Sequence, residues 1–367
     1  MSSFSVDPEQ SQTELLFAGF NQDFGCFACG TDTGFRIFNC EPFKNTFRRD
    51  FPNGGIGHVE MLFRCNILAL VGGGANPRFP PNKVMIWDDQ QGCAIGELSF
   101  RKEVKAVRLR RDRVVVVLED KIYVYNFADL TLLDHVPTIA NPYGLCALCP
   151  YSHNNVLVCP GLQRGHVRVE LYNQRRTSLI TAHESNLACL ALNFDGTRLA
   201  TASEKGTLIR IFDTESGDCL QELRRGLENA RITSLAFDSQ SRFLACSSDR
   251  GTVHVFKTSA KVRQSASLRP DSEDASQQEE SRGNTRHSLG FMRSVLPKYF
   301  SSEWSFAQFR VPTSKSVVAF APDNKLVIVT SDGAFYKVSF DPVDGGECEC
   351  DEYARFIVKA DEEQLQD

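Results

Sequence analysis

The chain has 367 residues, of which 42% are hydrophobic, and a formal net charge of -5 at pH 7. This length and composition suffice for a packed core, and no apolar run approaches the ~20 residues needed to cross a bilayer. The acidic balance argues against a surface that binds nucleic acid as a whole, because such domains are basic. Since the N-terminus has no signal-like run, we expect a cytoplasmic or peripheral protein without a nucleic-acid partner.

One pattern recurs seven times along the chain. Each repeat has an apolar strand, a turn rich in Asp, Asn or Ser, a second apolar strand, and a Gly before a strand ending in Ile, Val or Phe. The repeats lie, in chain order, at residues 15–38, 59–88, 104–125, 145–169, 187–213, 232–256 and 317–338. A period of roughly 40 to 45 residues with about four short strands is typical of WD-type propeller blades.

The sequence therefore predicts an all-β fold, a seven-bladed WD-type β-propeller forming one domain over residues 1–367. We expect the chain to act as a monomeric propeller. We also expect the N-terminal strand to pair with the last blade near residues 353–358, because a closed propeller leaves no free sheet edge.

A long insertion interrupts the sixth repeat. Residues 258–303 lie between its third and fourth predicted strands, and residues 269–286 are polar, charged and free of aromatic residues, which predicts disorder. Beyond them, a weakly basic amphipathic segment is suited to insertion into a membrane interface; its apolar residues are Leu289, Phe291, Met292 and Leu296. The alternative is a flexible tether whose apolar residues pack on the blade wall.

Two adjacent arginines, Arg224 and Arg225, close the fifth repeat before Gly226. Successive side chains of a strand point to opposite faces, so the two arginines should serve separate sites. The guanidinium fork matches phosphate geometry, which predicts two anion sites back to back. Gly226 would let the backbone turn sharply or approach a ligand closely. The alternative is a pair of solvated surface arginines.

Polar residues recur at matching places in the fifth and sixth repeats and supply hydroxyl and cationic groups for phosphate oxygens. Site 1 is expected to join Arg224 to His183, Thr201, Ser203, Lys205, Thr207 and Arg210. Site 2 is expected to join Arg225 to Ser248, Thr252 and His254. WD repeats also use Ser, Thr and His in internal hydrogen-bond networks, so either histidine could instead be a core residue.

No other motif predicts chemistry. The 13 cysteines are read as reduced core thiols, and pairs spaced three apart on strands cannot chelate one ion, so we expect no metal and no cofactor. The Gly run at residues 72–74 lacks the following Lys and Ser or Thr of a P-loop, and no nucleophile elbow surrounds Ser248. We expect a protein that is not an enzyme.

Several motifs together resemble a known family. They are Phe20-Asn21-Gln22-Asp23, Leu70-Val71-Gly72-Gly73-Gly74, Ile86-Trp87-Asp88-Asp89, Ser203-Glu204-Lys205-Gly206-Thr207 and Arg224-Arg225-Gly226. They resemble the PROPPINs, WD-repeat proteins that bind phosphoinositides in autophagy. Leu223 stands before the arginine pair where most members have Phe, and residues 296–306 are similar to the subgroup that pairs with the autophagic lipid-transfer protein.

The resemblance implies recognition of phosphatidylinositol 3-phosphate and phosphatidylinositol 3,5-bisphosphate through sites 1 and 2. It implies recruitment from the cytoplasm to preautophagosomal, autophagic and endosomal membranes as an effector in autophagosome formation. It further implies a lipid-transfer protein as partner, for which Asn21 and Asp23 in an exposed turn are the expected contacts; ordinary turn chemistry is the alternative. The alternative function is a WD-repeat scaffold that binds acidic peptides without recognising lipid.

Overall fold

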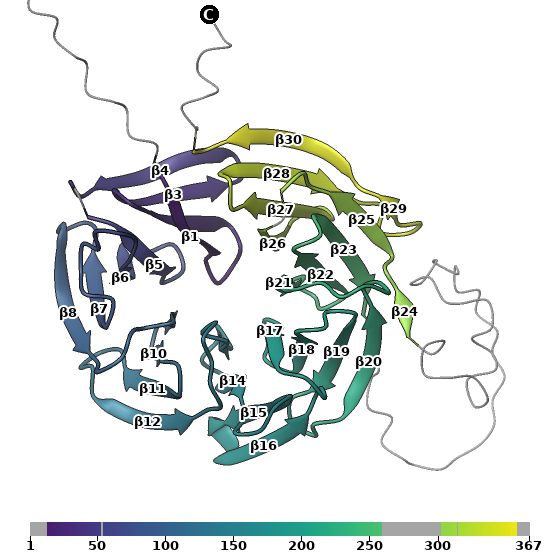
Figure 1. Ribbon diagram of the computed structural model, residues 1–367, viewed down its shortest axis with the longest axis horizontal. Helices are drawn as coiled ribbons and strands as arrows, with labels where there is room; N and C mark the ends of the chain where they lie inside the picture. The colour runs from purple at the N-terminus through teal and green to yellow at the C-terminus, as the bar shows by residue number, and fades with distance from the viewer. Residues whose placement is uncertain (1–12, 53, 259–301, 314, 358–367) are drawn as a thin grey trace, which may run out of the picture. The chain divides into compact units, whose positions relative to one another are not determined.

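The computed structural model describes residues 13–52, 54–258, 302–313 and 315–357. These residues form seven separate β-sheets whose strands follow one another along the chain (Figure 1). No α-helix occurs in these four ranges, where the helical element is the short 3-10 turn η1, Tyr172–Gln174. Seven sheets, one for each predicted repeat, agree with the predicted all-β propeller.

The chain divides into two compact units, which are described separately. The first comprises Met1–Glu103, Val329–Phe335 and Tyr353–Asp367. It holds the first sheet, ordered β1-β2-β3-β4: Leu15–Phe20, Cys26–Thr31, Gly34–Cys40 and Phe43–Asp50. It also holds the second sheet, ordered β5-β6-β7-β8: Ile56–Met61, Ile67–Gly72, Lys83–Asp88 and Cys93–Ser99.

The second compact unit comprises Val104–Ile328 and Tyr336–Glu352. Its third sheet contains β9 to β12: Ala106–Arg110, Arg113–Val117, Lys121–Asn126 and Leu132–Pro137. Its fourth contains β13 to β16: Ala147–Leu148, Val156–Pro160, His166–Leu171 and Arg176–Thr181. Its fifth begins with β17 to β20: Leu187–Leu192, Arg198–Ser203, Leu208–Asp213 and Cys219–Arg224.

The remaining strands form the sixth sheet and the last sheet. The sixth contains β21, β22, β23 and β25: Ile232–Phe237, Phe243–Ser248, Thr252–Lys257 and Ala307–Arg310. The last contains β26, β27, β28 and β30: Ser316–Ala321, Lys325–Thr330, Ala334–Ser339 and Glu349–Arg355. Because β30 supplies its fourth strand, and β1 pairs with β2 in the first sheet, the expected pairing of the N-terminal strand with the last blade is wrong.

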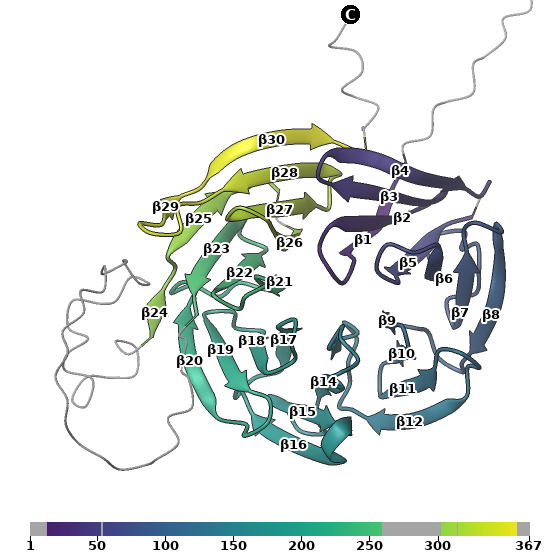
Figure 2. The ribbon, with the colours of Figure 1, turned by 180° about the vertical axis from the view of Figure 1, so that it is seen from behind.

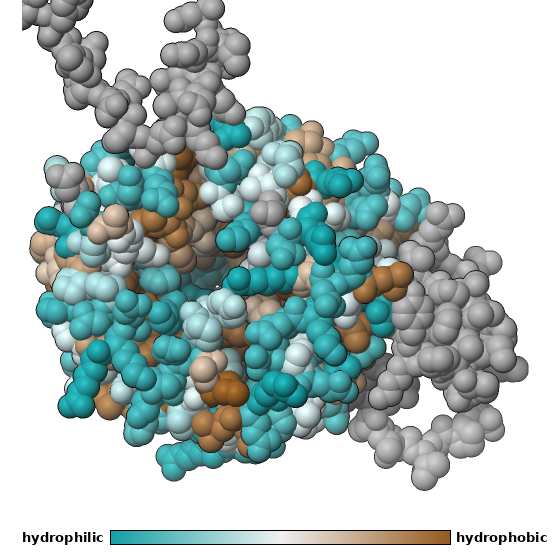
Figure 3. Space-filling view, viewed as in Figure 1, coloured by the Kyte–Doolittle hydropathy of each residue, from teal (hydrophilic) through white to brown (hydrophobic). Residues whose placement is uncertain are grey.

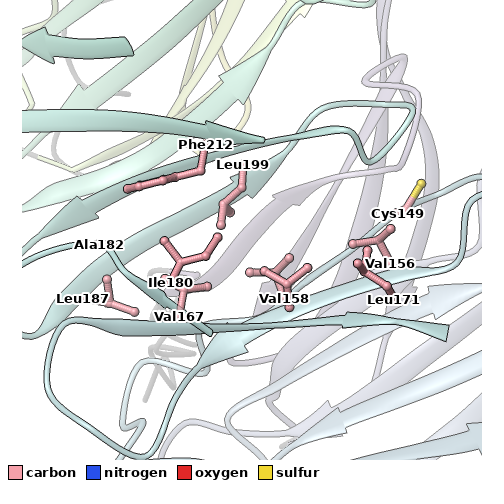
Figure 4. Packing of buried hydrophobic residues seen from close by; sticks show 11 residues of the cluster. Cys149, Val156, Val158, Val167, Leu171, Ile180, Ala182, Leu187, Leu199 and Phe212 are labelled. Carbon is pink, nitrogen blue, oxygen red and sulfur yellow. The ribbon is translucent and has the colours of Figure 1, made fainter. Parts of the chain in front are cut away.

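Burial falls from the middle strands of a sheet to its outermost strand. Every residue of β22 is buried, whereas the outermost strand β16 buries one of its six residues. Apolar side chains of neighbouring sheets pack together: one cluster joins Val158 and Val167 of the fourth sheet to Leu187 and Leu199 of the fifth (Figure 4). Fully burying one such side chain stabilises the fold by about 1.5–3 kcal/mol, which explains the dominance of Val, Ile and Leu in these strands.

The insertion lies where the sequence predicts it. Strand β23 ends at Lys257 and pairs with β25, so the third and fourth strands of the sixth sheet flank the inserted segment (Figure 2). Residues 259–301, including Leu289, Phe291, Met292 and Leu296, lie outside the described residues.

Two sheets carry a fifth strand that the repeat pattern does not predict. Strand β24, Glu303–Trp304, runs parallel to β20 at the edge of the fifth sheet (Figure 1). Strand β29, Gly346–Glu347, runs parallel to β25 at the edge of the sixth. In the described part of the chain, no helix is long and apolar enough to span a membrane.

Candidate functional site

Two equivalent turns mark one end of the fifth and sixth sheets. In the first, Gly206 N–H donates to Ser203 O at 2.9 Å; in the second, Gly251 N–H donates to Ser248 O at 3.3 Å. Both glycines have positive φ, 60° and 71°. A Cβ at Gly206 would stand 1.6 Å from the carbonyl oxygen of Ala230, so no other residue fits there without rearrangement. The repeated turn therefore places residues 203–207 and 248–252 at corresponding points.

Arg224 is the last residue of β20 and is 9% exposed. Its Nε donates to Ser302 Oγ at 2.8 Å, and its backbone lies opposite Trp304 of β24. The chain that returns from the insertion is thus fixed beside this arginine.

Arg225 has different surroundings. It is 9% exposed; its Nε donates to Gly206 O at 3.0 Å and its Nη2 donates to Glu228 O. Burial lowers the pKa of Arg225, and the nearby Arg250 adds to this effect. Nη1 has no hydrogen-bond partner among the described residues. The two adjacent guanidiniums therefore lie in separate surroundings, as strand alternation predicts.

Three predicted members of site 1 make side-chain contacts inside the protein. His183 Nε2 and Thr201 Oγ1 are 2.9 Å apart, and burial, with Arg210 nearby, lowers the His183 pKa to about 4. Arg210 Nε lies 2.9 Å from Glu222 Oε2. Thr201 is 0% exposed. For His183 and Thr201, the contacts match the internal hydrogen-bond network, which was the alternative.

The other predicted members of site 1 lie at the turn. Ser203 is buried, Thr207 is partly exposed, and Lys205 is exposed. Thr207 O accepts the backbone N–H of Arg225 at 3.0 Å, which ties the turn to the arginine pair. The side chain of Lys205 makes no ion pair within the described ranges, so its charge is available to an anion.

The predicted members of site 2 are buried or partly exposed residues of the sixth sheet. Ser248 and His254 are 1% and 8% exposed, and Thr252 is partly exposed opposite Arg310. Burial lowers the His254 pKa to about 4, and Arg225 contributes. His254 Nδ1 is buried and has no hydrogen-bond partner in the described part of the chain. A buried ring nitrogen without a hydrogen-bond partner lowers the stability of the fold unless a ligand or water forms that hydrogen bond.

The sequence interpretation missed two cations at this edge. Arg250 and Arg310 line one hollow with Asp249, next to the Ser248–Gly251 turn. The signal for Arg250 was present in the sequence, because Ser-Asp-Arg-Gly-Thr at 248–252 repeats Ser-Glu-Lys-Gly-Thr at 203–207 and aligns Arg250 with Lys205. No sequence motif marks Arg310, because it follows the insertion and lies at this edge only through the pairing of its strand with Thr252.

The expected partner residues lie in the first compact unit and differ in exposure. Asn21 is 2% exposed; its Oδ1 accepts Cys26 N–H at 3.0 Å and its Nδ2 donates to Phe63 O at 3.2 Å. The expectation that Asn21 is exposed is therefore wrong: it stabilises the turn from within. Asp23 is exposed and forms an ion pair with Arg64 at 3.0 Å.

No described cysteine forms a disulfide, and most of the cysteines in the strand cores are buried. Within the same ranges, no three His, Cys, Asp or Glu side chains come together in a way that could hold a metal ion.

Comparison with known proteins decides the family. The family model described as PROPPIN matches residues 15–353. The chain belongs to the PROPPIN family. Autophagy-related protein 18e of Arabidopsis thaliana is 41% identical over 345 residues, covering 93% of this chain and 87% of that protein. Autophagy-related protein 18 of Yarrowia lipolytica is 35% identical and covers 91% and 94%.

Among solved structures, KlAtg21 in complex with the coiled coil of AgAtg16 has a TM-score of 0.74 at 25% identity, covering 94% of this chain and 99% of that one. These similarities, with the seven sheets, show that this PROPPIN is a seven-bladed β-propeller. Its relatives are autophagy proteins. PROPPINs serve as scaffolds and effectors rather than enzymes.

Proposed function

We propose that this PROPPIN binds phosphatidylinositol 3-phosphate and phosphatidylinositol 3,5-bisphosphate through two sites at one edge of the fifth and sixth sheets. Binding recruits the protein to membranes where autophagosomes form. The observation that carries the proposal is His254, whose buried Nδ1 lacks a partner beside the similarly buried Arg225. A phosphate group bound there would form hydrogen bonds with both side chains.

In site 2, Arg225 Nη1, the Ser248 hydroxyl, the Thr252 hydroxyl and His254 Nδ1 are the groups that would bind the phosphate. Arg250 is exposed and adds charge at the rim, with its Nη2 3.8 Å from Glu228 Oε2. Because a phosphate dianion favours a protonated imidazole, binding would raise the His254 pKa.

In site 1, Arg224 would act with Ser203, Lys205 and Thr207, which lie at the turn. His183 and Arg210 would support this site from within the sheet rather than contact the phosphate, because each already has a partner there. Site 1 is thus smaller than the set of residues expected from the sequence.

Two sites that each bind a headgroup weakly can together bind a membrane tightly. Once one headgroup is bound, the second binding event is effectively intramolecular, and avidity can exceed either affinity by about 10² or more. Each nearby Lys or Arg adds about 1 kcal/mol of attraction to an anionic surface. The insertion at residues 258–303 would add a third contact through Leu289, Phe291, Met292 and Leu296.

The partner face would lie on the first sheet, with Asp23 as a contact for the autophagic lipid-transfer protein. Asp23 is exposed, and its ion pair with Arg64 is a surface pair of little energetic value, so a partner cation can replace Arg64 at small cost. The coiled coil bound to the related KlAtg21 indicates a second kind of partner to test on this chain.

Vesicle cosedimentation tests the lipid proposal. Wild type and the variant Arg224→Ala/Arg225→Ala are compared on vesicles with phosphatidylinositol 3-phosphate and on vesicles with phosphatidylinositol instead. The control Arg176→Ala/Arg242→Ala removes two exposed arginines outside both sites. We expect lipid-dependent pelleting of wild type and control, and its loss in the arginine-pair variant. A folded arginine-pair variant that pellets like wild type refutes the proposal and favours the acidic-peptide scaffold.

A further inference from the structure

A hollow of about 510 Å³ in the second compact unit lies next to site 2. Two arginines, Arg250 and Arg310, line it, and we name it the two-arginine hollow. The rest of its lining is Asp249, Gly251, Val311 and Pro312. Because residues 249–251 stand between Ser248 and Thr252 in the chain, the hollow and site 2 are built on the same turn.

Arg310 takes the place in the sixth sheet that Arg225 takes in the fifth. Thr252 pairs with Arg310 across strands β23 and β25. The equivalent threonine of the fifth sheet, Thr207, accepts the backbone N–H of Arg225 at 3.0 Å. Arg225 is 9% exposed, whereas Arg310 is exposed and forms no ion pair within the described ranges. Site 1 therefore has no exposed arginine in the corresponding place.

Arg250 connects the hollow to site 2. Its backbone N–H donates to the Ser248 hydroxyl at 3.5 Å, and its Nη2 donates to Asn229 O at 3.2 Å. Glu228 Oε2 lies 3.8 Å from the same nitrogen, but both side chains are more than half exposed, so water screens this pair. Burial lowers the pKa of Arg225, and the charge of Arg250 adds to the effect. Arg250 therefore acts electrostatically on the hollow and on the arginine of site 2.

One carboxylate, that of Asp249, also lines the hollow. Its Oδ1 accepts the backbone N–H of Arg231 at 3.0 Å, and the Asp249 N–H donates to Arg231 O at 3.0 Å. Asp249 forms no ion pair within the described ranges, so two guanidinium charges face one carboxylate and the hollow is positive. Hydrophilic side chains also predominate over the fifth and sixth sheets on the face that Figure 3 shows.

The turn of site 1 borders a different hollow. That hollow measures about 180 Å³, and Glu204 of the turn and Asn186 are among its lining residues. No arginine or lysine stands among the described residues that line it. Asn186 Nδ2 donates to Glu204 Oε2 at 3.2 Å, which leaves the carboxylate charge in place. A second phosphate group would thus meet a carboxylate beside site 1 and two guanidiniums beside site 2.

We propose that the two-arginine hollow binds the second phosphate of a bisphosphorylated inositol headgroup, so that site 2 prefers phosphatidylinositol 3,5-bisphosphate and site 1 does not. Both phosphates are carried by one inositol ring, so cations that bind the second must stand next to those that bind the first. Arginine forks match phosphate oxygens in geometry and charge. This inference rests on the proposed function of site 2 and adds which headgroup each site selects.

Titration calorimetry with soluble short-chain phosphatidylinositol 3,5-bisphosphate and phosphatidylinositol 3-phosphate tests it, with one site active at a time. In Arg224→Ala, where site 2 acts alone, we expect at least about a tenfold preference for the bisphosphate. Adding Arg310→Gln should reduce that preference at least about threefold, and adding Arg250→Gln/Arg310→Gln should reduce it to less than about twofold. In Arg225→Ala, where site 1 acts alone, the preference should be less than about threefold.

The charge control is Arg176→Gln/Arg242→Gln in the Arg224→Ala background, which removes two exposed arginines away from the hollow and should leave the preference unchanged. Thermal unfolding verifies that each variant is folded. Equal affinities for the two lipids in Arg224→Ala would overturn this inference and leave the proposed function standing. A preference that the charge control lowers as much as Arg250→Gln/Arg310→Gln does would also overturn it. If folded Arg224→Ala binds neither lipid, the proposed function of site 2 fails together with this inference.

Discussion

Arg224 and Ser302 lie 78 positions apart in sequence, yet Arg224 Nε donates to Ser302 Oγ at 2.8 Å. Ser302 is 2% exposed and directly precedes β24, which pairs with the strand that Arg224 ends. The end of the insertion is thereby joined to Arg224, one of the two arginines proposed to bind lipid headgroups. The position of the end of the insertion and the orientation of the Arg224 side chain are therefore physically coupled.

Ser302→Ala should weaken lipid binding at site 1. Loss of a hydrogen bond to a charged group costs about 1.5–3 kcal/mol, part of which reappears as freedom of the Arg224 side chain. We expect affinity for a soluble phosphatidylinositol 3-phosphate headgroup to fall about three- to tenfold in an Arg225→Ala background, where site 1 acts alone. Unchanged affinity there would mean that Ser302 does not orient Arg224 for binding.

Thr201→Val should reduce stability and leave lipid binding intact. The substitution keeps the shape but removes the hydroxyl that faces His183 Nε2 at 2.9 Å, leaving a buried polar nitrogen unsatisfied. The expected loss is about 1–3 kcal/mol in the free energy of unfolding, measured by urea denaturation. Thr207→Val, at a partly exposed position, serves as the control for stability. Loss of lipid binding with unchanged stability would instead place the Thr201 hydroxyl at the headgroup.

The two buried histidines predict a stability that falls in acid. Burial lowers the pKa of His183 and of His254 from 6.5 to about 4. Between these values the unfolded chain binds protons that the folded chain does not, so stability is full above about pH 6.5 and falls as the pH drops toward 4. At pH 5 each histidine should cost on the order of 2 kcal/mol relative to pH 7.

Urea denaturation at pH 7 and pH 5 measures this effect. His183→Gln and His254→Gln should each make the stability less pH-dependent, whereas His135→Gln, at an exposed position, should leave the dependence unchanged. Equal slopes in all three variants would show that carboxylates, not these histidines, produce the acid sensitivity.

Two glycines near the arginine pair should differ in how much stability they lose on substitution by alanine. Gly206→Ala introduces a Cβ 1.6 Å from a carbonyl oxygen at a residue with φ of 60°, and we expect a loss of more than about 2 kcal/mol in the free energy of unfolding. Around Gly226 no atom lies within 4 Å of the added Cβ, and its φ is not positive, so Gly226→Ala should change stability by less than about 0.5 kcal/mol.

Lipid binding by Gly226→Ala then separates the two roles expected for this glycine. The structure gives no reason for glycine in a sharp turn there, because its φ is not positive. If a headgroup approaches the backbone closely, the stable variant should bind lipid more weakly in cosedimentation. Normal binding would leave Gly226 without a functional role.

The sequence was most informative where the repeat itself carries the structure. Seven sheets and the separate surroundings of Arg224 and Arg225 follow from strand alternation and the repeat period, both local properties of the chain. The place of the insertion follows from the repeat in the same way.

Long-range contacts limited the rest of the prediction. The contact of Ser302 with Arg224 and the pairing of Arg310 with Thr252 depend on how the chain returns after the insertion, which no local pattern encodes. The burial of Asn21 and Thr201 depends on neighbours such as Phe63 and His183. A polar residue in a turn or at a strand end therefore could not be assigned to the surface or the interior from its type alone.

Titration calorimetry with a soluble short-chain phosphatidylinositol 3-phosphate counts the headgroup sites without a membrane, and it therefore tests whether Arg224 and Arg225 each serve a separate site. We expect two sites in wild type, one in Arg224→Ala, one in Arg225→Ala and none in the double variant. Loss of all binding in either single variant would contradict two separate sites and indicate one shared site. Two sites remaining in the folded double variant would contradict any role of the arginine pair in binding the headgroup.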